Sequence, residues 1–184
     1  MLITITGKPC SGKGTAGKLF CKKFNFEYLS AGDMNRALAK EFGFSNVIDL
    51  QKSERIKEVD KIIDSRLVEI GKTRSDDNLL LDSRLAWHFT PKSFKVFIDV
   101  DWNIAGERLL NANREMENNC STIEGAVKIL KERWNTENER YTRIYGVNNL
   151  DLSKYDFIIS SNNKTPEEIV DEIYINYQKF IKNS

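Results

Sequence analysis

The sequence predicts an α/β fold with three layers, in which a parallel sheet of five strands is covered by helices on both faces. Apolar runs alternate along the chain with segments of helical periodicity, an order typical of strand–helix–strand units. The runs are continuously apolar, as in Leu79-Leu80-Leu81, rather than alternating between apolar and polar residues. Such runs indicate strands that are buried on both faces.

Five apolar runs are predicted to form the strands, because each combines leucine, β-branched or aromatic residues and ends at polar residues or glycine. They are residues 2–6, 26–30, 78–82, 94–100 and 155–160. Ligands of open parallel sheets bind beyond the carboxyl ends of the strands. We therefore expect the residues that follow the first four strands to meet in space: 7–15, 30–33, 82–84 and 99–101.

Helices are predicted between the strands from apolar residues that recur every three or four positions. They are expected from the end of the first loop to residue 24, from about 31 to 42, from 51 to 72, from 102 toward 114, from 123 to about 145, and from Pro166 onward. The face predicted to be buried in the long helix after residue 123 carries Val127, Leu130, Trp134, Tyr141 and Ile144.

The composition is that of an ordinary globular protein, with 184 residues, 40% hydrophobic and 30% charged residues and a net charge of +1. Such a chain fits one domain and lacks the broad basic surface of a nucleic-acid binder. No apolar stretch approaches the ~20 residues of a membrane span, and the first strand leaves no room for a signal peptide. Three widely spaced cysteines favour reduced thiols. We expect a cytoplasmic monomer without nucleic-acid or membrane partners.

A glycine-rich loop joins the first strand to the first helix, with the sequence Gly7-Lys8-Pro9-Cys10-Ser11-Gly12-Lys13-Gly14-Thr15. Strand, glycine-rich loop and helix form the context that a phosphate-binding loop requires. Glycines let backbone N–H groups turn toward an anion, and the helix N-terminus adds the positive end of its dipole. Lys13 supplies a movable positive charge that can follow a phosphoryl group.

Phosphoryl transfer also needs positive charge on the transferred group and on the acceptor phosphate, and arginine binds phosphate bidentately. For any single arginine the alternative is a solvated surface residue. Arg84 stands out because it comes two residues after a buried strand, and Arg66 because it lies four residues from both Ile62 and Ile70. The candidate arginines are Arg36, Arg66, Arg84, Arg108, Arg114, Arg133 and Arg140.

Arg133, Glu137 and Arg140 have the spacing i, i+4 and i+7, so they share one face of the long helix. Two interpretations stay open for this set. The residues can face a substrate together, or they can form an intrahelical ladder of ion pairs on the surface.

Three other polar residues near strand ends, Asp82, Ser30 and Asp33, are candidates for the site. Asp82 ends the third strand beside the phosphate loop and can hold water on a Mg²⁺ ion, or it can simply begin a loop. Ser30 and Asp33 can contact a substrate, or they can cap the following helix. His88 has no visible acid or nucleophile partner, so we interpret it as a structural or surface residue.

Taken in order, these pieces resemble a small cytidylate kinase of the short, archaeal-like type, among the P-loop nucleoside monophosphate kinases. The loop form G-x-P-x-x-G-K-G-T is typical of those kinases, although Cys10 stands where they usually have glycine or another small residue. The other matching pieces are Ser30-Ala31-Gly32-Asp33, Ile63-Asp64-Ser65-Arg66, Asp82-Ser83-Arg84-Leu85-Ala86, Glu107-Arg108, Arg133 with Arg140, Ile144-Tyr145-Gly146 and Asp151-Leu152-Ser153-Lys154-Tyr155-Asp156.

The resemblance implies one kinase domain over residues 1–184, with the P-loop strand order 2-3-1-4-5. It implies a helical monophosphate-binding segment at about 31–73 and a short lid at about 110–120. ATP is the implied donor, with Mg²⁺, and a pyrimidine nucleoside monophosphate such as CMP or dCMP is the implied acceptor.

The resemblance also implies roles for single residues. Residues 7–15 and Arg108 would bind ATP; Arg36, Arg66 and Arg84 would hold the acceptor; and Arg114 in the lid, Arg133, Arg140 and Lys13 would act on the phosphates. Thr15 and Asp82 are expected to serve Mg²⁺, and Ser30, Asp33, Asp64 and Glu137 are further candidate substrate contacts.

The base of the acceptor is predicted from hydrogen-bonding chemistry. Cytosine offers an amino donor beside two acceptors, so a carboxylate, Asp33 or Asp64, can accept from it while Arg66 or Ser30 donates. Uracil would set a carbonyl against the same carboxylate. We therefore expect CMP and dCMP to be better acceptors than UMP, and all three to be better than AMP or GMP.

Two other function classes stay open. One is a different small P-loop kinase, acting on adenylate, shikimate or dephospho-coenzyme A. The other is a nucleotide-binding assembly ATPase that transfers nothing to a small acceptor. A GTP switch would need N-K-x-D to read guanine, and Asn163-Lys164-Thr165-Pro166 lacks the acid.

Overall fold

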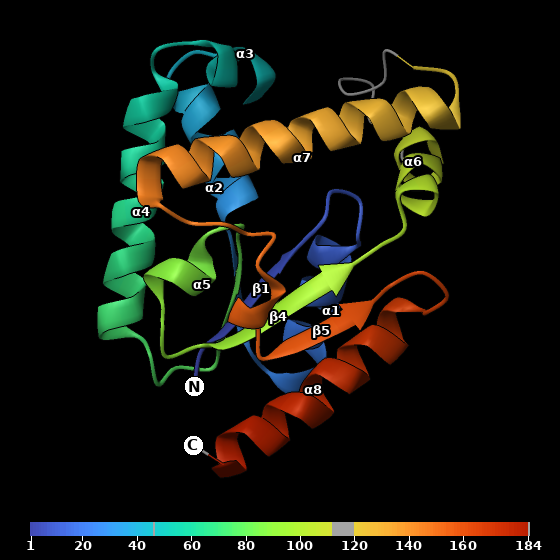
Figure 1. The fold of residues 1–184 in the computed structure, drawn as a ribbon. Coiled ribbons are helices and arrows are strands. Elements are labelled where there is room, and N and C mark those ends of the chain that lie inside the picture. Colours follow the sequence, from blue (N-terminus) through green and yellow to red (C-terminus); the bar gives the residue numbers. More distant parts are fainter. Residues whose placement is uncertain (46, 112–119, 184) are drawn as a thin grey trace.

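The computed structural model describes residues 1–45, 47–111 and 120–183. Its five strands form one all-parallel sheet in the order β2-β3-β1-β4-β5 (Figure 1), which confirms the predicted fold and strand order. Ile3 at the centre of the sheet pairs with Leu80 on one side and Phe94 on the other. The strands are β1 (Ile3–Gly7), β2 (Glu27–Ser30), β3 (Leu79–Asp82), β4 (Phe94–Asp99) and β5 (Phe157–Ser160).

The helices follow the predicted order with two differences. The helix expected over residues 51–72 is wrong as one element: α3 ends at Lys52, and α4 begins only at Ile56. Between them the Ser53 hydroxyl donates to the carbonyl of Leu50, which bends the chain into a turn. The short α5 was not predicted. The helices are α1 (Lys13–Phe24), α2 (Ala31–Glu41), α3 (Val47–Lys52), α4 (Ile56–Thr73), α5 (Ala86–Phe89), α6 (Trp102–Asn111), α7 (Ile123–Tyr145) and α8 (Pro166–Asn183), with a 3₁₀ helix η1 (Leu152–Lys154).

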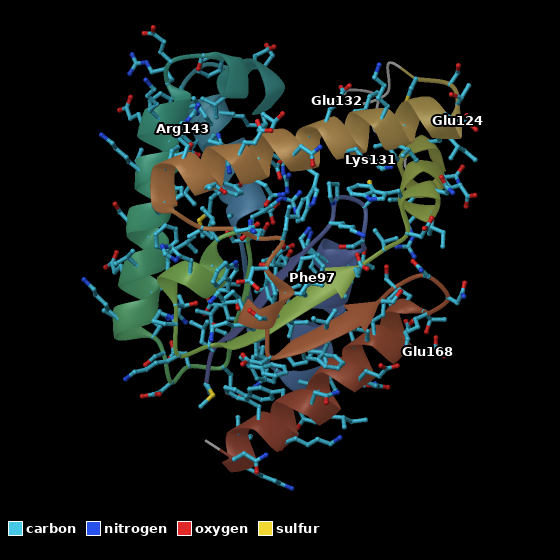
Figure 2. All side chains as sticks on the ribbon, in the orientation of Figure 1. Phe97, Glu124, Lys131, Glu132, Arg143 and Glu168 are labelled. Atoms are coloured by element: carbon cyan, nitrogen blue, oxygen red, sulfur yellow. The ribbon has the colours of Figure 1, made fainter. Side chains whose placement is uncertain are left out.

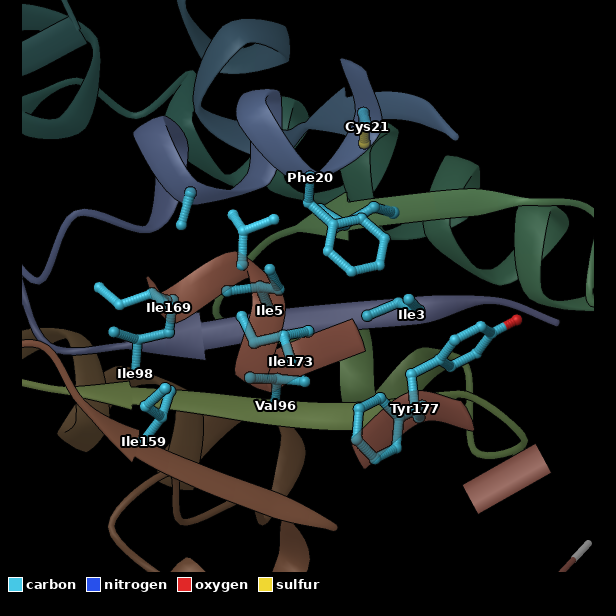
Figure 3. Close-up of a cluster of buried hydrophobic side chains, with 14 residues drawn as sticks. Ile3, Ile5, Phe20, Cys21, Val96, Ile98, Ile159, Ile169, Ile173 and Tyr177 are labelled. Carbon is cyan, nitrogen blue, oxygen red and sulfur yellow. The ribbon is translucent and has the colours of Figure 1, made fainter. Parts of the chain in front are cut away.

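One face of the sheet is covered by α1 and α8 (Figure 3). Phe20 of α1 and Ile173 of α8 are fully buried there against Ile3 and Ile5 of β1. Because successive strand side chains point to opposite faces, Leu2 beside them faces the other layer.

The opposite face is covered by α2 to α5, whose buried residues include Leu38, Leu50 and Val59. They pack on Leu79 and Leu81 of β3, so β3 is buried on both faces and its continuous apolar run is explained. Throughout the residues that the structure describes, no helix combines the length and the apolar character needed to cross a bilayer.

Helix α7 crosses above the carboxyl ends of the strands (Figure 1). Thr122 caps its N-terminus by accepting from the Gly125 N–H at 3.1 Å, and Gly146 ends it in the left-handed conformation. Its buried line includes Leu130 and Trp134, and Trp134 packs on Phe97 of β4. The prediction for Ile144 is wrong: the residue is 52% exposed, and at that end α7 contacts α4 and α5 through Tyr145 instead.

Candidate active site

The carboxyl ends of β1, β2 and β3 open into one cavity of about 630 Å³. The phosphate loop forms its floor on one side, α2 and α4 line it on another, and α7 passes along it. Sequence segments that are far apart therefore meet as expected, apart from residues 99–101, which do not line it. The predicted site residues that line it are Cys10, Ser11, Gly12, Lys13, Gly14, Thr15, Ser30, Asp33, Arg36, Asp64, Asp82, Arg84, Arg108, Arg133, Glu137 and Arg140.

The phosphate loop has a backbone that only certain residues permit. A Cβ on Gly7 would lie 2.1 Å from the carbonyl oxygen of Ile98, so glycine is required by the close approach of β4. Gly12 has φ 85° and Cys10 has φ 58°, and the second value is unfavourable for a side chain with a Cβ. Ser11 is 1% exposed, and its hydroxyl, on the cavity wall, has no hydrogen-bond partner within the described ranges. The loop therefore retains unused hydrogen-bonding capacity suited to a phosphate.

Two basic side chains hold the loop from outside the phosphate cradle. Lys8 forms an ion pair of 2.7 Å with Asp99 at the end of β4. Arg108 of α6 donates to the carbonyl of Cys10 at 3.2 Å and to the Ser161 carbonyl at 2.7 Å. Arg108 also lines the cavity.

Burial disfavours the charged ammonium of Lys13. Burial lowers the pKa of Lys13 to about 8, and the nearby Arg84 guanidinium adds to the shift. The carboxylates of Asp82 and Glu137 act in the opposite direction. An anion bound beside the ammonium would favour its charged form.

Glu137 of α7 lies between two arginines. It accepts from Nε of Arg84 and, at 3.1 Å, from Nε of Arg133. Burial alone would raise the pKa of Glu137, but the charges of Arg84 and Arg133 outweigh it, so the pKa is lowered and the carboxylate is ionised. Arg84 also donates to the Gly7 carbonyl at 2.6 Å. The end of β3, the phosphate loop and α7 are thus joined through two side chains.

Of the two interpretations left open for α7, the ladder of ion pairs is present only in part. Arg133 pairs with Glu137 on the same helix, but Arg140 lies 3.3 Å from Asp60 of α4, across the cavity. Asp60 was missed by sequence reasoning. The sequence feature that could have identified Asp60 is its i, i+4 spacing with Asp64, which places both acids on one face of α4.

Asp64 is held by a residue to which no role had been assigned. The Tyr145 hydroxyl, at the end of α7, donates to Oδ2 of Asp64. Burial raises the pKa of Asp64 and that of Asp60, while Tyr145 and Arg140 favour the ionised forms. The cavity therefore has two carboxylates on one wall, each with a partner from the facing helix.

At the start of α2, the Ser30 hydroxyl accepts from the Asp33 N–H at 3.2 Å, so the capping role is present. The Asp33 carboxylate pairs with Arg36 in the same helix, and both side chains are at least half exposed. These residues form the outer wall of the site.

Asp82 lies beside the first turn of α1. It accepts from the Tyr28 hydroxyl at 2.9 Å, and a Cβ on Gly14 would lie 3.7 Å from its Oδ2. Thr15 follows directly and is exposed to the cavity. A carboxylate and a hydroxyl are the hard oxygen donors that Mg²⁺ prefers, so these residues fit that ion. Tyr28 was not predicted to belong to the site.

Two predictions on arginines need comment. Arg66 is exposed and does not line the cavity, so its inward placement is wrong. It precedes the buried Leu67 by one residue, whereas Asp64 follows the buried Ile63, and these positions lie on opposite flanks of α4. Arg114 and most of the predicted lid lie outside the described residues.

Comparisons with known proteins give a consistent picture. The family model described as an AAA domain matches residues 3–125. The cytidylate kinase of Methanococcoides burtonii is 35% identical over 167 residues, 88% of each chain, and that of Methanococcus aeolicus is 34% identical over 88% of this chain and 89% of its own. Shikimate kinase from Aquifex aeolicus superposes over both entire chains with a TM-score of 0.60 at 21% identity, which shows a shared fold.

Proposed function

Since the chain belongs to the cytidylate kinase family of P-loop kinases, we propose that it transfers the γ-phosphoryl group of ATP to a pyrimidine nucleoside monophosphate, preferring CMP and dCMP. The observation that carries this proposal is the continuity of the cavity. One space extends from Lys13 of the phosphate loop to the carboxylate of Asp64 on α4. A donor phosphate and an acceptor base can be bound within it together.

On the donor side, residues 7–15 would hold the ATP phosphates, and Arg108 would lie near the base. Lys13 would pair with oxygens of the transferred group. Thr15 and Asp82 would hold Mg²⁺, which when bound neutralises charge on the donor phosphates.

On the acceptor side, Arg36 and Arg84 would bind the phosphate of the monophosphate, since both line the cavity. Asp64 is the better candidate to accept from the cytosine amino group. Asp33 is half exposed and paired with Arg36, whereas Asp64 also lines the cavity and is less exposed. Segment 31–73 would thus act as the monophosphate-binding segment, and segment 110–120 as the lid.

In the transfer, an oxygen of the acceptor phosphate bonds to the γ-phosphorus as the bond from that phosphorus to the bridging oxygen of ADP breaks. Such reactions need aligned reactants and placed positive charge more than a strong base. Arg133 and Arg140 line the cavity from α7, and Lys13 lines it from below. We propose that these residues, together with Arg114, stabilise the negative charge that builds on the transferred group.

The wider setting is inferred in the same way. We infer one kinase domain over residues 1–184 that works as a cytoplasmic monomer on small nucleotides, with no nucleic-acid or membrane partner. The near-neutral charge and the thiols of Cys21 and Cys120, which form no disulfide, support this inference.

The proposal is tested by measuring ADP release with ATP and Mg²⁺ against a panel of acceptors: CMP, dCMP, UMP, AMP, GMP, shikimate, dephospho-coenzyme A and no acceptor. We expect the highest kcat/KM with CMP or dCMP. AMP ranking first would instead indicate an adenylate kinase. Equal ADP release with and without acceptors would favour an assembly ATPase.

A further inference from the structure

Two acids of α4 line the cavity one helical turn apart, and they have different partners. Asp60 lies 3.3 Å from the guanidinium of Arg140, an ion pair that neutralises its charge. Asp64 instead accepts a hydrogen bond from the neutral hydroxyl of Tyr145. Both partners come from α7, and all four side chains line the cavity. The two carboxylates are therefore chemically unequal.

We propose that Tyr145 is a positioning residue that determines the choice between cytosine and uracil, by keeping Asp64 an ionised hydrogen-bond acceptor. This inference rests on the proposed function, because it assumes that a pyrimidine base is bound in the cavity. It adds a residue that does not itself contact the reacting phosphates.

The geometry fits this role. Tyr145 donates to Oδ2 of Asp64, and Oδ1 is a second carboxylate oxygen that can accept from a ligand. The tyrosine ring is held edge-to-face on Phe89 of α5, with centroids 5.7 Å apart, and lies 6.4 Å from the ring of Tyr141. A fixed ring holds the donor in place, so the carboxylate is oriented before a ligand binds.

Charged and titratable groups face Asp64 from three helices. On α4 itself, Asp60 disfavours the ionised form of Asp64. On α7, the hydroxyl of Tyr145 and the charge of Arg140 favour it, and on α5 His88 does the same. Burial raises the pKa of Asp64, and the hydrogen bond from Tyr145 is the largest effect that opposes burial. Removing the hydroxyl would therefore raise this pKa further.

The protonation state of Asp64 decides which base it can bind. An ionised carboxylate accepts from the amino group of cytosine and repels the carbonyl oxygen at the same position of uracil. A protonated carboxyl group can donate to that carbonyl. The ratio of kcat/KM for CMP to that for UMP should thus fall as Asp64 becomes protonated.

The experiment measures this ratio from about pH 5.5 to 8.5, a range below which cytosine itself begins to protonate. Taking a ratio cancels the titration of the phosphate group and of ATP, which the two reactions share. Four proteins are compared: the parent, Tyr145→Phe, Tyr141→Phe and Asp64→Asn. Tyr141→Phe is the matched control, because it removes a phenol one turn away on α7 that interacts with Arg140 rather than Asp64.

In Tyr145→Phe, the midpoint of the fall in the ratio should lie at a higher pH than in the parent, because the hydrogen bond that favours ionised Asp64 is lost, and the ratio should be lower than in the parent on the acidic side of the range. The ratio should approach that of the parent at the alkaline end. Tyr141→Phe should keep the parent midpoint. Asp64→Asn should have a low ratio that does not change with pH, because its amide cannot titrate.

Two results would overturn the inference while leaving the kinase activity established. One is a Tyr145→Phe profile with the parent midpoint, whatever its effect on overall rate. The other is an unchanged, pH-dependent CMP preference in Asp64→Asn. Failure of the parent protein to phosphorylate any pyrimidine monophosphate would instead overturn the proposed function itself.

Discussion

Arg84 donates a hydrogen bond of 2.6 Å to the carbonyl oxygen of Gly7, so a candidate acceptor-binding residue is tied to the phosphate loop. The same guanidinium binds Glu137, and it lies 5.1 Å from the ring of Trp134. Its geometry is therefore fixed by three contacts to β1 and α7, which is the arrangement expected of a group that aligns two phosphates.

Arg84→Ala should raise KM for the monophosphate far more than KM for ATP, because it removes a guanidinium–phosphate contact of ~1.5–3 kcal/mol. It should also lower the free energy of unfolding by about 2 kcal/mol, since Glu137 loses one of its two cationic partners. Kinetics and denaturant unfolding measure the two effects separately.

The double variant Arg84→Ala with Glu137→Gln is the control for that prediction. It should recover much of the lost stability, because no buried charge is left underpaired, yet it should not recover acceptor binding. If Arg84→Ala affected KM for ATP alone, Arg84 would belong to the donor side.

Lys13→Ala should nearly abolish turnover, by roughly a hundredfold or more, while the fold persists. Because burial lowers the pKa of Lys13 to about 8, its charge destabilises the free protein at neutral pH. Between about pH 8 and the higher pKa of Lys13 in the unfolded chain, the unfolded state binds more protons than the folded state. The penalty that the Lys13 charge imposes on the free energy of unfolding therefore decreases as pH rises through this range.

Thermal unfolding tests the second part of that prediction. At pH 7 Lys13→Ala should be at least as stable as the parent, and its advantage should shrink toward pH 9.5. Lys22→Ala, an exposed position of the same helix, should show neither effect. Turnover within a few-fold of the parent would exclude the loop as the active site.

How far the sequence could predict this site depends on what fixes each residue. The phosphate loop, Asp82 and Arg84 were placed correctly because parallel strands deliver their following residues to one edge. Arg66 was misplaced because a periodic helix defines a buried stripe but not which flank of it faces a cavity. That flank depends on where α7 crosses α4, a relation between segments distant in sequence.

The same limit applies to partners across the cavity. The spacing on α7 correctly suggested Arg133 with Glu137, since these residues are neighbours on one helix. It could not suggest Arg140 with Asp60 or Tyr145 with Asp64, because each pair joins two helices. Ser30 was predicted with both of its roles open, and its capping bond is now visible.

Mg²⁺ should be required for transfer, and excess chelator should abolish it. Asp82→Asn should raise the Mg²⁺ concentration needed for half-maximal rate, because it removes the charge proposed to hold the ion through water. Tyr28→Phe is the matched control: it removes the hydroxyl that binds Asp82 but keeps the carboxylate. A full rate in chelator would contradict the prediction.

Cys10→Gly should stabilise the protein by about 0.5–1 kcal/mol. Cys10 has φ 58°, where a Cβ costs roughly 1–2 kcal/mol, and glycine returns part of that gain through its flexibility in the unfolded chain. Cys10→Ala keeps the Cβ and should bring no such gain. Denaturant midpoints for the three proteins decide the matter, and equal stability of the glycine and alanine variants would contradict the strain.

Arg133→Ala and Arg140→Ala should lower kcat more than they raise either KM, because both residues are proposed to meet charge that develops only during transfer. We expect a fall of about ten- to a hundredfold for each. Arg143→Ala is the matched control, since it removes an arginine from the outer surface of the same helix (Figure 2) and should leave kcat unchanged.

The two test residues differ in their ion-pair partners. Without Arg133, Glu137 still forms its ion pair with Arg84. Without Arg140, Asp60 has no ion pair left among those of the described residues. Arg140→Ala should therefore also lower the melting temperature, and Asp60→Asn in the same protein should restore it without restoring kcat. Restoration of both would mean that Arg140 serves only to neutralise Asp60.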